Sequence, residues 1–119
     1  MGLFVVEKLV NGVMVLDLRG RLVLGEETEE LRERLKRLIA AGHRRILLNL
    51  EDVSYIDSSG LSTLITSFVS VRKQGGDLKL LRLTGRVNDL MQITKLSTVF
   101  EIYDTLEQAQ SSFSNPAAT

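Results

Sequence analysis

The centre of the predicted fold is the segment Ile46-Leu47-Leu48-Asn49-Leu50, which continues through Val53-Ser54-Tyr55-Ile56 to Asp57-Ser58-Ser59-Gly60. A short and almost continuously apolar run is typical of a strand that is covered on both faces of a sheet, so it predicts a central strand. The polar and glycine residues that follow predict a turn, and the apolar spacing after the turn predicts a helix from about Ser58 to Lys73. Together these segments indicate a strand, a turn and a helix in an open α/β sheet.

The residues before this stretch predict an antiparallel hairpin and a helix. The run from Leu3 to Val10 is rich in β-branched residues, and Asn11-Gly12 is a strong hairpin signal. From Val13 to Arg19 the residues alternate, which predicts one buried face made by Met14, Leu16 and Leu18. A helix is expected over residues 26–41, with Gly42 as its stop, ion pairs Glu30–Arg34 and Glu33–Arg37, and an apolar stripe of Leu31, Leu35, Leu38 and Ile39.

The residues after the central stretch continue the alternation. A strand is expected over 78–83, a helix capped by Thr84, a short strand over 99–103, and a last helix capped by Asp104 with Glu107. The predicted fold class is α/β: a mixed, mostly parallel sheet of about five strands, with an N-terminal antiparallel hairpin and about four helices. We expect one domain over 1–112 and a flexible tail over 113–119.

Composition narrows the possible functions. The 119 residues hold 15 Lys plus Arg and 15 Asp plus Glu, and this balance argues against nucleic-acid binding. The chain has no cysteine and a single histidine, His43, so no metal site or cofactor is expected. No apolar run approaches the ~20 residues that cross a bilayer. With no signal peptide at the N-terminus, we expect a cytoplasmic protein without a membrane segment.

The segment Asp57-Ser58-Ser59-Gly60 lies in a turn between a strand and a helix, where functional residues are frequent in open α/β sheets. A helix N-terminus offers unpaired N–H groups that could hold a phosphate on Ser59, Asp57 could cap the helix or orient the hydroxyl, and Gly60 would let another surface approach. The alternative is that Asp57 or Ser58 is an ordinary N-cap. A catalytic serine is disfavoured because no G-x-S-x-G motif is present and nothing marks His43 as its base.

The helix that follows has an unusual predicted outer face. Its buried stripe is expected to be Leu61, Leu64, Ile65, Phe68 and Val69, and small hydroxyls lie opposite: Ser59, Thr63, Thr66 and Ser70, flanked by Ser62 and Ser67. An uncharged face of this kind could pack flat against another protein at little cost in desolvation. The alternatives are neutral drift or burial under a neighbouring element of the same fold.

The run Asp57 to Leu61, after Glu51-Asp52-Val53 and together with Gly20-Arg21-Leu22 and Gly75-Gly76, resembles the bacterial STAS-domain family of anti-sigma-factor antagonists over residues 3–112. The resemblance implies binding to an anti-sigma factor that is also a serine kinase of the histidine-kinase-like ATPase fold, with release of a sigma factor. It implies that the kinase inactivates the antagonist by phosphorylating Ser59 and that a serine phosphatase reverses this.

The same resemblance implies partner-binding residues in the motif, Asp57, Ser58, Ser59 and Gly60, and in the loop over 20–25, Gly20, Arg21, Leu22 and Val23. The hydroxyl face of the helix adds Ser62, Thr63 and Thr66 to the expected partner-binding surface. Val23 stands where the family commonly has an acidic residue. The alternative function is a STAS scaffold or ligand-sensing subunit that is not a kinase substrate. An enzyme is disfavoured because no phosphate loop or metal cluster is present. We expect a monomer, or a weak dimer through an exposed first strand that carries Phe4 and Val6.

Overall fold

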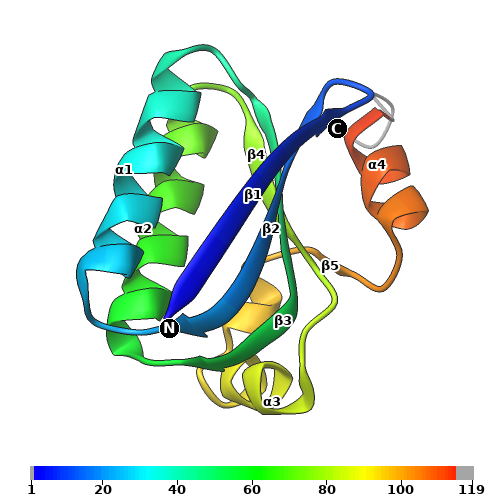
Figure 1. Ribbon diagram of the computed structural model, residues 1–119. Helices are drawn as coiled ribbons and strands as arrows, with labels where there is room; N and C mark the ends of the chain where they lie inside the picture. Colours follow the sequence, from blue (N-terminus) through cyan, green and yellow to red (C-terminus); the bar gives the residue numbers. More distant parts are fainter. Residues whose placement is uncertain (1, 115–119) are drawn as a thin grey trace.

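The computed structural model describes residues 2–114. Its centre is a five-stranded sheet with the spatial order β1-β2-β3-β4-β5 (Figure 1). The first pair is antiparallel and the other three pairs are parallel, which confirms the predicted fold class. The strands are β1 (Leu3–Val10), β2 (Val13–Leu22), β3 (Arg45–Ile56), β4 (Asp77–Leu81) and β5 (Ile102–Tyr103).

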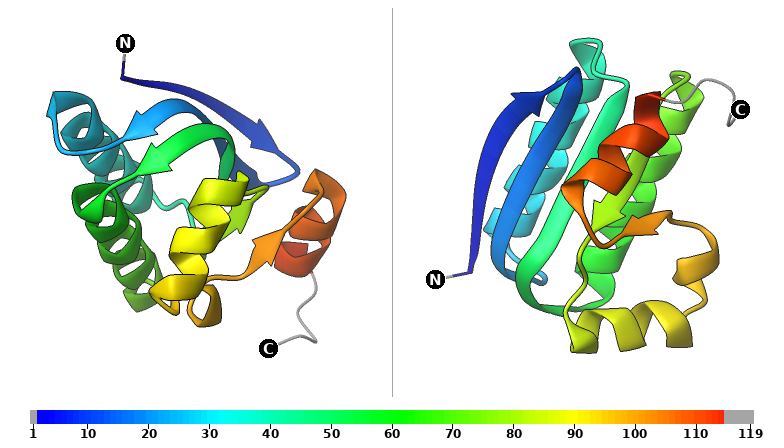
Figure 2. Two further views of the ribbon diagram at one scale, coloured as in Figure 1. Left: turned by 90° about the horizontal axis from the view of Figure 1, so that it is seen from below. Right: turned by 90° about the vertical axis from the view of Figure 1, so that its right-hand side faces the viewer.

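Helices cover both faces of the sheet unequally. Helices α1 and α2 lie side by side over one face, and α4 covers the other face only near the hairpin end (Figure 2). Helix α3 lies beyond the carboxyl end of β4 (Figure 1). The helices are α1 (Glu26–Ala40), α2 (Ser58–Lys73), α3 (Gly85–Ile93) and α4 (Leu106–Ser114), with a single 3₁₀ turn at Leu96–Thr98. No helix within 2–114 is long and apolar enough to span a membrane.

The core confirms that β3 is the central strand. Ile46, Leu47, Leu48 and Leu50 are fully buried. Those that face α1 and α2 join the large core, whereas Leu47 joins a smaller cluster with Val13, Val15 and Ala109 under α4. The prediction of a single buried face for β2 is therefore incomplete, because α4 buries the second face at the hairpin end.

Helix α1 buries its predicted apolar stripe, but the ion pairs of its charged residues differ from those predicted. Leu31, Leu35 and Ile39 are buried, and Gly42 follows the helix in a left-handed conformation. Arg34 forms its ion pair with Glu7 of β1 at 2.6 Å, and Glu33 pairs with Lys36. The predicted i,i+4 pairs are replaced because β1 passes beside α1 and brings a carboxylate to Arg34.

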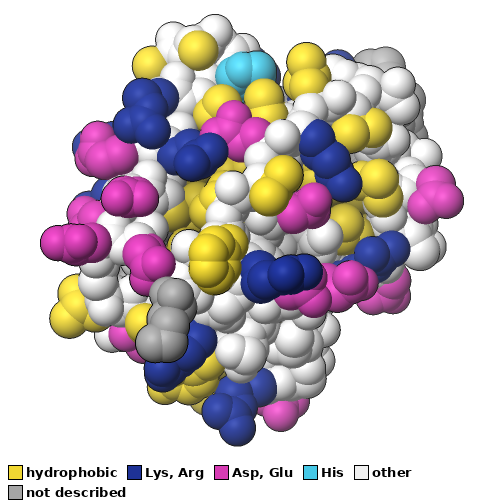
Figure 3. All heavy atoms as spheres, in the orientation of Figure 1, with side chains coloured by type: hydrophobic (Ala, Val, Ile, Leu, Met, Phe, Trp, Pro, Cys, Tyr) yellow, Lys and Arg dark blue, Asp and Glu magenta, His cyan; other side chains and the backbone are white. Residues whose placement is uncertain are grey.

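The edge strand β1 leaves apolar side chains in solvent. Phe4, Val6 and Leu9 are all exposed. Figure 3 shows hydrophobic side chains spaced along this part of the surface, with acidic and basic ones beside them. Charged neighbours of this kind, including the Lys8–Asp17 ion pair at 3.2 Å, are a usual protection of an edge strand against pairing with other chains.

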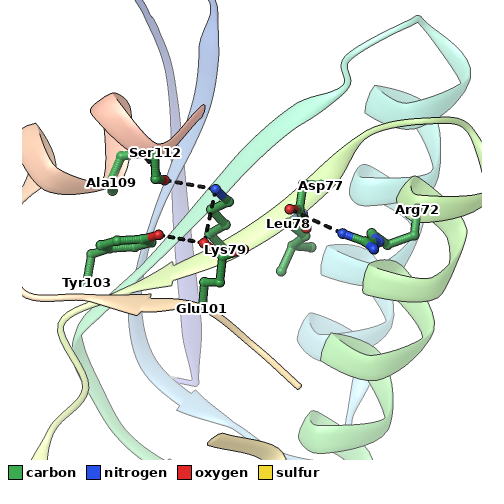
Figure 4. Close-up of polar contacts among 8 residues, drawn as sticks. All are labelled: Arg72, Asp77, Leu78, Lys79, Glu101, Tyr103, Ala109 and Ser112. Carbon is green, nitrogen blue, oxygen red and sulfur yellow. Dashed lines mark hydrogen bonds and ion pairs between the residues drawn. The ribbon is translucent and has the colours of Figure 1, made fainter. Parts of the chain in front are cut away.

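A buried lysine fixes α4 to the sheet (Figure 4). Lys79 of β4 is only 5% exposed, and its Nζ donates to Ser112 Oγ at 2.9 Å. The same nitrogen lies 3.2 Å from a carboxylate oxygen of Glu101 and 4.5 Å from the ring centre of Phe113. The Tyr103 hydroxyl, which donates to Glu101, has the largest effect on the pKa of the Glu101 carboxyl and lowers it; burial opposes this effect, and Lys79 lowers the pKa further. The buried ammonium thus has a carboxylate, a hydroxyl and an aromatic ring as partners.

Two expectations for the C-terminal region are wrong. Thr105, not Asp104, caps α4, because its Oγ1 accepts the N–H of Gln108 at 3.1 Å. The predicted tail also begins too early, since α4 runs to Ser114 and Phe113 packs against the smaller core. The rest of that predicted tail, 115–119, lies outside the described residues.

Candidate functional site

Asp57 joins the two segments that the sequence singled out. Its Oδ1 accepts the N–H of Gly60 at 2.9 Å, so Asp57 is the N-cap of α2 and Ser58 is the first helical residue. Its Oδ2 accepts the N–H of Leu24 in the loop between β2 and α1, also at 2.9 Å. The ordinary-cap interpretation is therefore correct, but the carboxylate does more than cap, because it also fixes the neighbouring loop to the mouth of α2.

The hydrogen bonds to Asp57 favour its ionised form. The backbone N–H groups of Leu24 and then Gly60 lower the pKa of the Asp57 carboxyl below its ordinary value, and a smaller effect of burial opposes them. A negative charge at this position also interacts favourably with the N-terminus of α2. At neutral pH the link between the loop and the helix is thus a charged one.

Gly60 serves a contact within the chain. It is buried, and a Cβ at this position would lie 2.1 Å from the carbonyl oxygen of Leu22. The same carbonyl accepts the N–H of Asp57 at 3.2 Å. Gly60 and Leu22, which were expected to contact a partner, are both buried, because the end of β2 and the first turn of α2 pack against each other there.

The two serines of the motif lie at the surface. Ser58 is exposed, and Ser59 is partly exposed on the first turn of α2. The carbonyl oxygen of Ser59 accepts the hydroxyl of Thr63 at 3.2 Å, so the backbone of this turn is held within the helix. The Ser59 side chain is therefore not sealed in the interior.

The outer face of α2 differs from the prediction. Thr63 and Ser67 are buried, so Thr63 does not lie on a partner-binding surface, while Ile65 and Val69 are 38% and 44% exposed. The Thr63 hydroxyl can be buried because the helix itself satisfies it. The surface that α2 presents, here called the α2 face, consists of Ser58, Ser62, Ile65, Thr66 and Val69.

A signal for this arrangement exists in the sequence. Gly60, Thr63, Ser67 and Val71 follow one another at spacings of three, four and four, and all are buried. This is a helical stripe of mostly small side chains, which lets a helix pack closely against its neighbours. The predicted buried stripe differs because it follows the larger apolar residues and not the small residues that continue from Gly60.

The end of β2, which runs to Leu22, and the loop that follows it supply the second exposed segment. Gly20 has a φ of +118°, and a Cβ there would lie 1.7 Å from the Gly2 carbonyl oxygen, so the bend needs glycine. Arg21 is exposed, Val23 is partly exposed, and Leu24 is 77% exposed. Leu24 belongs to the loop over 20–25 that was expected beside the site, but its hydrogen bond to Asp57 was not predicted, because no local pattern marks it.

Comparison with known proteins identifies the family. The family model described as STAS domain matches residues 5–109. The chain belongs to the STAS domain family.

The anti-sigma-B factor antagonist of Bacillus subtilis is similar to this STAS domain, with 43% identity over 72 residues, which are 60% of this chain and 65% of that protein. The anti-sigma-B factor antagonist of Staphylococcus aureus (strain NCTC 8325) is 32% identical over 78 residues, or 66% of this chain and 72% of that protein. The match thus spans slightly less than two thirds of the Bacillus relative.

Solved structures share the fold of this STAS domain. The protein TM1081 of Thermotoga maritima superposes with a TM-score of 0.87 at 25% identity, covering 93% of this chain and 95% of that one. The anti-sigma factor antagonist SpoIIAA in its unphosphorylated form gives 0.80 at 23% identity, with coverage of 92% and 95%. The phosphorylated form of SpoIIAA gives 0.73 at 22% identity, with coverage of 92% and 98%.

Proposed function

We propose that this STAS domain is an anti-sigma-factor antagonist, a non-catalytic protein of the cytoplasm that binds an anti-sigma factor and thereby releases a sigma factor. The observation that carries the proposal is the geometry at the N-terminus of α2. There the partly exposed Ser59 lies between the α2 face and a loop that Asp57 fixes in place. The names of the Bacillus and Staphylococcus relatives support the same role.

The α2 face has the composition of a surface that binds protein. Ile65 and Val69 supply apolar area, and Ser58, Ser62 and Thr66 surround them with short uncharged hydroxyls. Burying such side chains costs little rotamer entropy and requires no charge to lose its water. A partner that covers this face would also cover Ser59.

Phosphorylation of Ser59 would switch this contact. We infer that the anti-sigma factor is a serine kinase of the histidine-kinase-like ATPase fold, and that a serine phosphatase restores the hydroxyl. A phosphate adds about −1.5 to −2 charges near neutral pH, which the N-terminus of a helix tolerates. Inside a contact, the same dianion would have to lose its water without a compensating charge. The modification is therefore expected to weaken binding while the fold stays as it is, and SpoIIAA keeps this fold in both forms.

Incubation with the cognate anti-sigma factor and ATP tests the proposal. Mass spectrometry should find a single phosphate on Ser59, and Ser59→Ala should remain unmodified. By isothermal titration calorimetry, the phosphorylated protein and Ser59→Asp should bind the anti-sigma factor about 100-fold more weakly, because an uncompensated charge in a contact costs several kcal/mol. Ser114, at the end of α4 and far along the chain from the site, is not expected to be modified.

Two outcomes would contradict this proposal. Ser59→Asp that folds normally and binds as tightly as the wild type would remove the switch. Wild-type protein that binds its partner but accepts no phosphate would favour the alternative function, a STAS scaffold or ligand-sensing subunit.

A further inference from the structure

A basic hollow adjoins the proposed site on the same edge of the sheet. Arg21 at the end of β2 and Arg86 in the first turn of α3 both approach the ring of Tyr55, near the end of β3. Their guanidinium carbons lie 5.6 Å and 5.9 Å from the centre of that ring. With Ser54 and Thr84, these three side chains line a hollow of about 680 Å³.

The two arginines of this hollow have no carboxylate partner in the part of the chain that the structure describes. Among the described residues, neither Arg21 nor Arg86 forms an ion pair, whereas Arg19, Arg34 and Arg82 each pair with a carboxylate. Two guanidinium groups beside one ring repel each other, and the positive end of α3, which begins at Gly85, adds to the same potential. A carboxylate between the two arginines would be attracted by both guanidinium groups and by the N-terminus of α3.

The hollow and the Ser59 site are built from the same short segments. Arg21 precedes Leu22, whose carbonyl accepts the N–H of Asp57, and Tyr55 lies two residues before Asp57. Thr84 is tied to the same strand, since its hydroxyl donates to the carbonyl of Val53 at 3.1 Å. Because the carboxyl ends of β2, β3 and β4 meet at one edge, a single protein can cover both places.

We propose that the Arg21–Tyr55–Arg86 hollow binds an acidic side chain, Asp or Glu, of the protein partner that covers the α2 face. This inference rests on the proposed function for the existence of that partner, and it adds the chemistry by which the partner is recognised. Arginine is suited to the role because its planar guanidinium can hold a carboxylate through two parallel hydrogen bonds. Tyr55, which is 37% exposed, offers its ring to the aliphatic stem of the same side chain.

Charge reversal at the hollow tests the inference against the cognate anti-sigma factor. Arg21→Glu and Arg86→Glu should each weaken binding about tenfold or more by calorimetry, as expected for central charged contacts. Both should also reduce the dependence of affinity on salt concentration, since exposed charges attract less as ionic strength rises. The matched control is Arg45→Glu, an equal charge change at an exposed residue at the start of β3, at the other end of the sheet.

The outcomes separate this inference from the proposed function. If the wild type does not bind the anti-sigma factor, the proposed function fails. If the wild type binds, but Arg21→Glu and Arg86→Glu bind with wild-type affinity, or lose no more than Arg45→Glu, the hollow is not a recognition site and the inference is overturned. A change of one acidic residue of the anti-sigma factor to Arg that restores binding to Arg21→Glu would support the inference and identify the bound side chain.

Discussion

The two ends of the sheet hold the same kind of contact in opposite settings. At the hairpin end, the Lys79 ammonium lies 4.5 Å from the ring centre of Phe113 and is covered by α4. At the other end, the guanidinium of Arg21 lies 5.6 Å from the ring centre of Tyr55 and is exposed. Lys79 has a carboxylate and a hydroxyl as partners, whereas Arg21 and Arg86 have no ion pair among the described residues.

This difference separates a structural cation from one available for binding. A buried charge must be compensated inside the fold, and Glu101 and Ser112 do so for Lys79. An exposed cation pays no such cost, because water solvates it until a ligand replaces the water. We therefore expect changes at the Lys79 end to alter stability, and changes at the Arg21 end to alter binding.

The largest loss of stability is expected at Gly60, which is tightly packed although it lies at the same end of the sheet as Arg21. Gly60→Ala places a Cβ 2.1 Å from the Leu22 carbonyl oxygen, which is a backbone atom and moves only with β2. We expect a decrease of about 3 kcal/mol in the free energy of unfolding, at the upper end of the usual cost of overpacking. Gly85→Ala is the control, because a Cβ there meets nothing within 4 Å. Urea denaturation measures both, and equal stability of the two variants would contradict the tight contact.

The next effect tests the buried end. Lys79→Ala removes the packing against Phe113 and the bond to Ser112, and we expect a decrease of about 2 kcal/mol in the free energy of unfolding. Lys79→Met keeps most of the volume without the charge and should lose less, because its ion-pair partner Glu101 is 53% exposed and is solvated by water once the ammonium is removed. If Lys79→Met is destabilised as much as Lys79→Ala, the charge and not the packing holds α4.

A smaller effect concerns Asp57 and depends on pH. Because hydrogen bonds lower its pKa in the folded state, the stability from its ionised form is present above the unfolded pKa and is lost as pH falls through the folded value. Asp57→Asn should therefore have a lower Tm than the wild type near neutral pH, with the difference shrinking below about pH 4. Scanning calorimetry across this range measures it, and a difference that stays constant down to about pH 2 would contradict the charged link.

The smallest effect on stability is expected for the exposed arginines. Arg21→Gln and Arg86→Gln remove charges that form no ion pair with another described residue, so the free energy of unfolding should change by no more than about 0.5 kcal/mol. Chemical denaturation of both variants beside Lys79→Ala gives the comparison directly. A loss as large as that of Lys79→Ala would mean that the two guanidinium groups hold the fold together, and the distinction between the two ends would fail.

Much of the fold could be predicted because its signals are local. The apolar run at Ile46 to Leu50 indicated the central strand, Asn11-Gly12 the hairpin, and Thr84 the cap of α3, where its Oγ1 accepts the N–H of Val87 at 3.4 Å. The position of the candidate site was predicted for the same reason, since an Asp before a helix is a frequent cap. Hydrophobic periodicity and helix capping involve residues that are close in the chain, so a single sequence is enough to predict strands, helices and caps.

Local patterns in the sequence therefore predict the order of strands and helices, the central place of β3 and the location of Ser59 at the start of a helix. The ion pair between Glu7 and Arg34 and the hydrogen bond that holds Leu24 at Asp57 join elements that no local pattern connects. The tertiary structure also brought Arg21 and Arg86, which lie far apart in the chain, to the ring of Tyr55. The physical reason is that burial and charge pairing depend on which elements meet in space, and no pattern within a single element records its neighbours.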